Sequence, residues 1–309
     1  MIVSEGDNVS AVTVAQIKQQ SKHLAQANET DGSQSKFPIF WITDWLLHVL
    51  DKPALFLITN DEYQLNTSEV ERFRSGVTKM QQGTPLAYLT GHQEFWSLDF
   101  KVNEHTLIPR PDTEVLVEQV LSWINSHYPS KPQTSKRLLD LGTGSGCIAI
   151  SLAHELDASK SLNAWQVTAI DSSAAALKIA HENAIKHQTD IEFILSHWYD
   201  KLPIPTPNDA LFEVIVSNPP YIDEADEHLQ GLQAEPMSSL SAPNKGLGDI
   251  EHIVKQASAY LRVGGLLAIE HGYDQGSQVY DIFLNHGFES IKTIKDYASN
   301  DRVTLGQLK

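Results

Sequence analysis

The sequence predicts an α/β protein with a doubly wound, mainly parallel seven-stranded sheet, preceded by a small helical N-terminal domain. From residue 137 onward, short β-branched apolar runs alternate with longer segments of helical periodicity, as in βαβ units. A glycine-rich turn follows the first of these runs. Parallel strands need crossover helices, and such sheets bind ligands where the carboxyl ends of the strands meet. The fold class therefore also predicts where the functional residues lie.

The first part of the chain, residues 1–36, is predicted to be a polar N-terminal extension. Val9–Ala27 has apolar residues near one helical face and is expected to form a helix. Asn28–Lys36 has no apolar periodicity and is expected to be a loop. No function follows from this extension.

Residues 37–93 are predicted to form a small helical domain. Apolar side chains recur at helical spacing in Trp41–Leu50 and again in Ser68–Gln81. Ser68 is a candidate N-cap, with Glu71 three residues later at the capping-box position.

Residues 94–112 are predicted to be a hairpin that links two domains. Phe95–Val102 and Thr106–Ile108 have strand character. Pro109 and Pro111 follow them and stiffen the exit, because proline fixes φ.

Residues 113–309 are predicted to form the sheet domain, which begins with a helix over Thr113–Ile124. The predicted strands of the alternating pattern are Arg137–Leu141, Trp165–Ile170, Ile191–Leu195, Glu213–Val216 and Leu266–Glu270. The helices after the first two strands are Cys147–Glu155 and Ser173–Lys186, and the terminal hairpin is Phe288–Tyr297 with Arg302–Leu308. Five strands with crossovers and a final hairpin account for the seven-stranded sheet.

The composition is that of a globular protein, with 41% hydrophobic and 20% charged residues. No apolar stretch approaches the length of a membrane span, and the N-terminus lacks the basic start and apolar centre of a signal peptide. The single cysteine, Cys147, excludes an internal disulfide. We therefore expect a cytoplasmic protein without a membrane partner.

The charge balance bears on the partners. Asp and Glu number 39 against 23 Lys and Arg, a net charge of −16, and no run is rich in Lys or Arg. Non-specific nucleic-acid binding needs clustered basic side chains, so no direct nucleic-acid partner is expected, and a basic protein segment is a more natural one. The histidines form neither a His-Glu-x-x-His motif nor a Cys/His cluster, so no metal site is predicted.

A glycine loop, Asp140–Gly146, leads from the first strand into the first helix. Gly144–Ala149 matches the dinucleotide fingerprint, in which a pyrophosphate sits on the helix N-terminus. The other interpretation is S-adenosylmethionine (AdoMet), which has no phosphate and whose loop follows an acidic residue, here Asp140. Asp171, at the end of the second strand, is placed for a ribose diol in either case. The loop predicts a nucleoside cofactor without choosing between the two.

The segment Asn218-Pro219-Pro220-Tyr221 discriminates between these cofactors. Two prolines remove two backbone N–H donors, so the loop presents mainly acceptors. A hydride-transfer enzyme would need a proton donor here, whereas methyl transfer to an amide or amine needs acceptors. If the Asn218 side-chain oxygen and the Pro219 carbonyl accept the two hydrogens of an amide, its nitrogen is aligned on the methyl group. Tyr221 could hold the flat substrate group by stacking.

Asp140–Gly146 together with Asn218–Tyr221 resembles the class I AdoMet-dependent methyltransferases that act on exocyclic or amide nitrogen, a Rossmann-like fold. The wider match resembles the bacterial peptide chain release factor glutamine N5-methyltransferases. The supporting segments are Thr90–Trp96, Leu107–Glu114, Glu235–Pro236, Glu270–Gly272 and Arg302–Gly306. Leu107–Glu114 is the most specific of them.

The resemblance implies that the helical domain docks the release factor. It also implies that the sheet domain transfers a methyl group from AdoMet to the glutamine side-chain nitrogen of a Gly-Gly-Gln loop. The cofactor-binding residues that it implies are Gly142, Thr143, Gly144, Ser145, Gly146, Asp171, Trp198 and Asn218. The predicted substrate-binding residues are Asn218, Pro219, Pro220 and Tyr221, of which Asn218, Pro219 and Tyr221 are the predicted catalytic ones.

For two residues, a purely structural role is an alternative to the functional one. Trp198 would pack beside the adenine or be an ordinary core residue, and Arg110 would lie at the mouth of the active site or form a surface salt bridge. The competing functions are a glutamine methyltransferase of a ribosomal protein, disfavoured by Leu107–Glu114, and an N6-adenine nucleic-acid methyltransferase, disfavoured by the acidic charge. A non-catalytic AdoMet-binding module is disfavoured by the intact glycine loop and Asn218.

Overall fold

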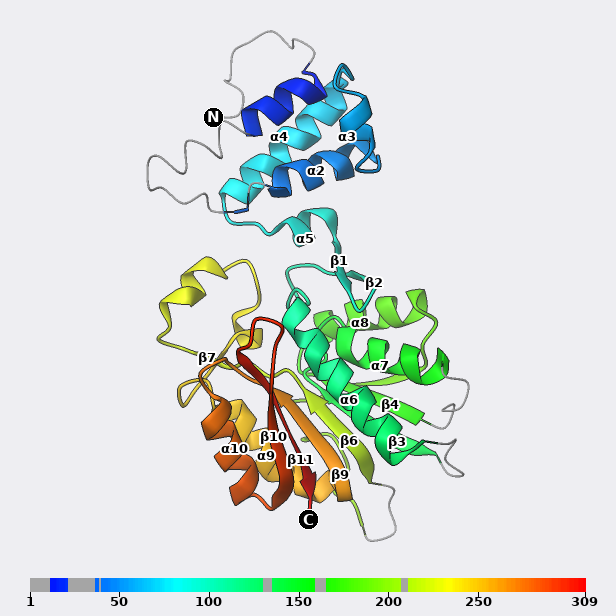
Figure 1. Ribbon diagram of the computed structural model, residues 1–309, viewed down its shortest axis with the longest axis vertical. Coiled ribbons are helices and arrows are strands. Elements are labelled where there is room, and N and C mark those ends of the chain that lie inside the picture. Colours follow the sequence, from blue (N-terminus) through cyan, green and yellow to red (C-terminus); the bar gives the residue numbers. More distant parts are fainter. Residues whose placement is uncertain (1–11, 22–36, 39, 130–134, 159–164, 207–210) are drawn as a thin grey trace. The chain divides into compact units, whose positions relative to one another are not determined.

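The computed structural model describes residues 12–21, 37–38, 40–129, 135–158, 165–206 and 211–309. The chain forms two compact units, Met1–Gly91 and His92–Lys309 (Figure 1). None of the helices among the described residues combines the length and the hydropathy that crossing a membrane requires. The two units are described separately below.

The first unit is helical. Its elements are a helix over residues 14–21, α2 (Phe40–Leu50), α3 (Phe56–Thr59), α4 (Thr67–Gln81) and α5 (Leu86–Thr90). Val14 and Ile17 are buried in the same core as Trp45 and Phe73, so residues 14–21 belong to this unit rather than to a separate extension. The rest of the predicted helix, residues 9–11 and 22–27, and the predicted loop at 28–36 lie outside the described residues.

Helix α4 begins earlier than the predicted cap. Asn66 is the N-cap: its Oδ1 accepts from the Glu69 N–H at 2.9 Å, and Glu69 Oε2 accepts from the Asn66 N–H at 2.8 Å. The prediction of Ser68 with Glu71 was therefore wrong. Both pairs have the capping-box spacing, and Asn66 has the extended backbone that an N-cap needs.

The second unit is built on a seven-stranded sheet with the order β10-β11-β9-β6-β3-β4-β5 (Figure 1). The strands are β3 (Lys136–Leu141), β4 (Trp165–Asp171), β5 (Ile191–Leu195), β6 (Phe212–Ser217), β9 (Leu261–Glu270), β10 (Phe288–Lys295) and β11 (Asp301–Leu308). The pairs from β5 to β9 are parallel, and β11 is antiparallel to both of its neighbours. The predicted fold class and terminal hairpin are confirmed.

Helices cover both faces of this sheet. The core on one face contains α6 (Glu114–His127) and α7 (Cys147–Ala158), with Ala184 of α8 (Ala174–Lys186). The core on the other face contains α9 (Gly248–Tyr260) and α10 (Gly276–Asn285). A short parallel pair, β7 (Ile222–Asp223) with β8 (Ser241–Ala242), lies after β6.

The predicted linker belongs to the second unit. The hairpin consists of β1 (His92–Phe95) and β2 (Leu98–Lys101), and Trp96 and Ser97 form its two-residue turn with φ of 53° and 57°. Residues 106–108, predicted as the second arm, form no strand. Phe95 and Phe100 pack into the core of the second unit, and this burial ties the hairpin to the sheet domain.

The packing of α2 on α4 yields a prediction for Gly76. Alanine usually stabilises a helix interior by about 1 kcal/mol over glycine. Here a Cβ at Gly76 would lie 2.1 Å from Trp45 Cε2, and the Trp45 indole is held by a 3.0 Å hydrogen bond to the Phe73 carbonyl. We expect Gly76→Ala to lower the free energy of unfolding by about 1–3 kcal/mol. Urea unfolding followed by circular dichroism measures this.

Ser75→Ala is the matched control, because Ser75 is exposed on the same helix turn and its change should stay within about 0.5 kcal/mol. A Gly76→Ala variant as stable as the parent would show that the indole can move aside at little cost.

Candidate active site

The glycine loop between β3 and α7 has the backbone that its sequence requires. Gly142, Gly144 and Gly146 all have left-handed φ, at 74°, 56° and 84°. A side chain at Gly146 would meet Ile150 Cδ1 at 2.8 Å, whereas a Cβ at Gly144 would have no heavy atom within 4 Å. Gly146 therefore allows helix packing, and Gly144 leaves open space for a ligand.

Asp140 supports this loop from within the protein. The side chain is fully buried, and its Oδ2 accepts a 2.7 Å hydrogen bond from the Thr143 hydroxyl. Burial raises the pKa of Asp140 to about 7, against the opposing effect of Thr143. Asp140 Oδ1 is buried without a hydrogen-bond partner among the described residues. Asp140 and Thr143 thus hold the loop and do not line the cavity described below.

Asp171, the last residue of β4, fixes the other side of the loop. Its Oδ2 accepts from the Gly144 N–H at 2.8 Å, and its Oδ1 accepts from the Ser173 N–H at 2.8 Å. Burial raises the pKa of Asp171 despite these bonds. A carboxylate has about four acceptor positions, so Asp171 keeps acceptor capacity for the hydroxyls of a ligand.

A cavity of about 400 Å³ lies at the carboxyl ends of the strands. It is lined by Glu104, His105, Leu107, Gly142, Gly144, Asp171, Ser172, Ser173, Ala176, Ser196, His197, Trp198, Asn218, Pro220, Pro236, Ser238, Ser239, Ser241 and Asp249. Its size is in the range of small-molecule sites. Of the predicted site residues, Gly142, Gly144, Asp171, Trp198, Asn218 and Pro220 lie together here.

Trp198 forms one wall of this cavity. Only 9% of the residue is exposed, and its ring lies 3.3 Å from where a Cβ on Gly142 would be. The indole Nε1 donates to Asp249 Oδ1 at 3.3 Å. Asp249 comes from α9, and no sequence motif pointed to it.

Asn218 follows β6 and lies beside the glycine loop because β6 pairs with β3 in parallel. Its Nδ2 donates to Thr113 Oγ1 at 3.3 Å, so the amide oxygen points away from Thr113. Within the described part of the chain this oxygen accepts no hydrogen bond, so it is available to a ligand in the cavity. The sequence predicted Asn218 as an acceptor but gave no role to Thr113.

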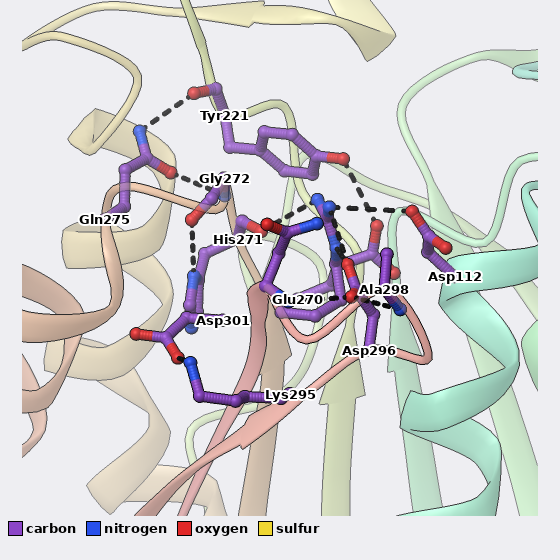
Figure 2. Close-up of polar contacts among 12 residues, drawn as sticks. Asp112, Tyr221, Glu270, His271, Gly272, Gln275, Lys295, Asp296, Ala298 and Asp301 are labelled. Carbon is purple, nitrogen blue, oxygen red and sulfur yellow. Dashed lines mark hydrogen bonds and ion pairs between the residues drawn. The ribbon is translucent and has the colours of Figure 1, made fainter.

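The other predicted site residues lie outside the cavity lining. Thr143, Ser145 and Pro219 are buried, and Gly146 packs against α8. The Tyr221 hydroxyl donates to Glu270 Oε1 at 3.2 Å, and the Tyr221 carbonyl accepts from Gln275 Nε2 at 2.9 Å (Figure 2). The hydroxyl and the carbonyl of Tyr221 are therefore both engaged, and Tyr221 is not among the residues that line the cavity.

Glu270, at the end of β9, also had no predicted role. Its side chain is 1% exposed. Burial raises its pKa to about 7, against the opposing effects of Thr113, the Arg302 guanidinium and Tyr221. Arg302 itself pairs with Asp296 at 3.1 Å and with Asp112 at 3.5 Å. Glu270 lies in the segment Glu270–Gly272, which supported the family resemblance. The sequence therefore drew attention to this residue but suggested no role for it.

Arg110 is placed by a buried acid. It pairs with Glu235 Oε1, and Glu235 Oε2 accepts from the Ile108 N–H at 3.0 Å. The Glu235 side chain is 3% exposed, while that of Arg110 is 37% exposed. Since Leu107 and Pro236 line the cavity, this ion pair joins two segments at its edge. Arg110 thus forms a salt bridge near the site, which combines both of its sequence interpretations.

A doubly wound sheet, a glycine loop between the fully buried Asp140 and the half-buried Asp171, and a cavity at the carboxyl ends of the strands fit the fold and site of a class I methyltransferase. The Methyltransferase small domain family matches residues 119–235, and the PrmC N-terminal domain matches residues 42–91. The chain belongs to the release factor glutamine methyltransferase family, as its similarity to named relatives shows.

Several relatives carry the name release factor glutamine methyltransferase, and three of them illustrate the similarity. The protein of Shewanella oneidensis is 41% identical over 85% of this chain and 86% of its own length. The protein of Aliivibrio fischeri is 42% identical over 93% of this chain and 95% of its own length. The protein of Escherichia coli is 40% identical over 85% of this chain and 89% of its own length.

Solved structures are more distant. The hMettl16 catalytic domain, solved in complex with a 3′UTR hairpin, is 14% identical over 78% of this chain and 80% of its own, with a TM-score of 0.49. The relatives, and not such structures, assign the family.

The position of Asp171 yields a prediction for cofactor affinity. We expect Asp171→Ala to weaken AdoMet binding, because it removes acceptors for the ribose and releases the Gly144 and Ser173 amides. Losing one or two charge-assisted bonds, each worth about 1.5–3 kcal/mol, raises Kd roughly tenfold or more. Calorimetric titration measures this. The exposed Asp281→Ala on α10 is the control, and unchanged affinity in a folded Asp171→Ala chain would remove Asp171 from the site.

The raised pKa of Asp140 yields a prediction for stability. The folded protein keeps this proton up to about pH 7, whereas the unfolded chain loses it near its ordinary value of 3.8. Between these limits the folded state binds more protons, so stability falls as pH rises, by at most about 1.4 kcal/mol per pH unit for one group. Asp140→Asn removes this contribution. Urea unfolding at several pH values should show a flatter profile for the variant than for the parent, and parallel profiles would contradict the assignment.

Proposed function

We propose that this chain methylates the side-chain nitrogen N5 of the glutamine in the Gly-Gly-Gln motif of peptide chain release factors, with AdoMet as the methyl donor. Membership of the release factor glutamine methyltransferase family supports the substrate class. The observation that carries the mechanism is the Asn218 amide, whose nitrogen is held by Thr113 and whose oxygen is left to the cavity.

The residues around the cavity fit AdoMet. Gly144 leaves open space at the loop, Asp171 offers acceptor oxygens, and the buried Trp198 indole forms a flat apolar wall. We infer that Asp171 would hold the ribose, Trp198 would pack beside the adenine, and Gly142–Gly146 would accommodate the methionine part. The cofactor, when bound, supplies an electrophilic methyl group on a sulfonium centre.

Asn218 would prepare the acceptor nitrogen for this group. An amide nitrogen is a weak nucleophile because its lone pair is delocalised into the carbonyl. The Asn218 oxygen would accept one of its hydrogens, orient the lone pair and stabilise positive charge as it develops on nitrogen. The Pro219 carbonyl, predicted as the second acceptor, belongs to a buried residue outside the cavity lining. Pro220, which lines the cavity, would limit the position of the flat amide.

Tyr221 would act on the loop rather than on the substrate. Its hydroxyl and its carbonyl are both engaged, with Glu270 and Gln275. These bonds secure the end of Asn218–Tyr221 from behind, where the sequence alone suggested stacking on the substrate. Its part in the reaction would therefore be to keep the acceptors at a fixed position.

The remaining partner assignments follow from the charge and the domain division. The unit of residues 1–91, which contains the PrmC N-terminal domain, would dock the release factor. The net charge of −16 favours a basic protein surface over nucleic acid or an anionic membrane, and the substrate places the reaction in the cytoplasm. The names of the relatives favour release factors over the ribosomal-protein and adenine alternatives.

The role of Asn218 gives the sharpest test of this function. We expect Asn218→Ala to lower turnover by a factor of about 10²–10³, as when one polar group is removed from a preorganised site. Asn218→Asp should not restore it, since the carboxylate adds charge beside a sulfonium and cannot donate to Thr113. The measurement is single-turnover methylation of a release factor at saturating AdoMet, with the modified residue mapped by mass spectrometry.

Asn285→Ala, at an exposed position that ends α10, serves as the control and should behave like the parent. Near-normal turnover of Asn218→Ala would remove Asn218 from the reaction. A methyl group found on any residue other than a glutamine would refute the proposed function.

A further inference from the structure

Asn183 is a fully buried amide on α8 that the proposed mechanism does not use. Its side chain makes three hydrogen bonds, and each goes to the backbone of another segment. Oδ1 accepts from the Lys101 N–H at 2.8 Å, and Nδ2 donates to the Lys101 carbonyl at 3.0 Å and to the Ser145 carbonyl at 2.9 Å. An amide supplies the one acceptor and two donors that this set needs, whereas a carboxylate only accepts and an aliphatic side chain does neither.

Asn183 holds the glycine loop from the α8 side. On the β4 side, the Gly142 N–H donates to the Ile170 carbonyl at 2.8 Å. Ser145 lies toward the other end of the loop, where its carbonyl accepts from Asn183. Gly144, which leaves open space and lines the cavity, lies between these two fixed points. The course of the loop past the cavity therefore depends on the Asn183 amide as well as on β4.

The surroundings of this amide are tightly packed. A Cβ at Gly146 would lie 3.2 Å from Ala180 Cβ, and Ala180 is one helical turn before Asn183 on α8. Ser145 is also buried. Because solvent does not reach this region, no water replaces the amide as a donor, and a Ser145 carbonyl without Asn183 would be a buried acceptor left unpaired.

The same amide joins the glycine loop to the hairpin of β1 and β2. Lys101 is the last residue of β2, and both of its backbone groups bond Asn183. Lys186 of α8 donates to the Asp99 carbonyl of β2 at 2.7 Å, and Figure 1 shows β2 next to α8. The hairpin begins at His92, directly after the first unit of the chain. The segment that leads from the first unit into the sheet domain and the glycine loop are therefore bonded to one side chain.

We propose that Asn183 is a positioning residue for AdoMet binding, which acts through the Ser145 carbonyl and joins the glycine loop to the hairpin. The inference rests on AdoMet as the cofactor of the function proposed above. Without the amide donor, the loop can relieve the unpaired Ser145 carbonyl by leaving the conformation that takes the cofactor. The apparent affinity then falls with the fraction of chains whose loop is in that conformation.

Asn183→Asp tests the bond to the loop, because a carboxylate of the same shape can accept from the Lys101 N–H but cannot donate to Ser145. We expect the Kd for AdoMet, measured by calorimetric titration, to rise roughly tenfold. Single-turnover methyl transfer at saturating AdoMet should change much less, since excess cofactor selects the competent loop. Asn183→Ala removes all three bonds and should raise the Kd at least as much.

Glu213→Gln is the matched control. Glu213 is also a buried side chain that bonds the backbone of a neighbouring strand, since it accepts from the Arg137 N–H at 2.6 Å, but it lies at the opposite end of β6 from the site. We expect this change to lower the free energy of unfolding in urea and to leave the Kd for AdoMet unchanged. An equal rise in Kd for Glu213→Gln and Asn183→Asp would show that lost stability weakens binding, and would overturn the inference.

Hydrogen exchange of the parent chain tests the link to the hairpin without any substitution. The Lys101 amide exchanges only when its bond to Asn183 opens, and this opening also disturbs the amide that holds the loop. A ligand that binds only the closed loop must therefore slow the exchange. We expect saturating AdoMet to slow exchange in the peptide that contains Lys101 in the parent, and to do so less in Asn183→Ala. Mass spectrometry of peptic fragments measures this.

Two further results would overturn the inference while the proposed function stands. One is parent-like AdoMet affinity in folded Asn183→Asp and Asn183→Ala chains. The other is exchange at Lys101 that AdoMet leaves unchanged in a parent that binds AdoMet and methylates a release factor. A parent chain that binds no AdoMet would overturn the proposed function and the inference together.

Discussion

Strand β6 pairs in parallel with β3 and β9, and this pairing places the functional residues of this protein together at the carboxyl ends of the three strands. Leu141, Ser217 and Ile269 are in register across the three strands, and the Ser217 hydroxyl donates to the Leu141 carbonyl at 2.7 Å. Asn218 directly follows Ser217, and Glu270 directly follows Ile269. The glycine loop, the amide acceptor and the buried acid are therefore close because of strand order, and a different order would separate all three.

Three carboxyl groups whose pKa is raised by burial lie at the carboxyl ends of these strands. The pKa of Asp140, Asp171 and Glu270 is raised in each case, and desolvation is the main cause. Asp171 is compensated by backbone amides, whereas Asp140 and Glu270 each keep one oxygen without a hydrogen-bond partner among the described residues. Such groups lower stability, and they are expected where function rather than packing has selected the residue.

The sequence was sufficient for the sheet and for the residues that carry a motif. The strand Ile191–Leu195 was bounded correctly because turn residues flank its apolar run. The N-cap of α4 was misplaced because two pairs share the capping spacing, and only tertiary structure selects Asn66. Thr113 lies 105 residues from Asn218 in the chain, so no local pattern could reveal the hydrogen bond between them. Tyr221 was predicted as a site residue from its motif, but only the fold shows that its hydroxyl is directed to Glu270.

The segment Leu107–Glu114 was the most specific part of the sequence resemblance, and its contacts give it a physical role. Successive residues bind different parts of the second unit: Ile108 and Arg110 bind Glu235, Asp112 binds Arg302, Thr113 binds Asn218, and Glu114 Oε1 accepts from the Trp96 N–H at 2.9 Å. None of these side chains needs to touch the reacting atoms. The segment instead joins the hairpin, the cavity edge, the terminal strand and the acceptor loop, so that the position of the Asn218 amide depends on all of them at once.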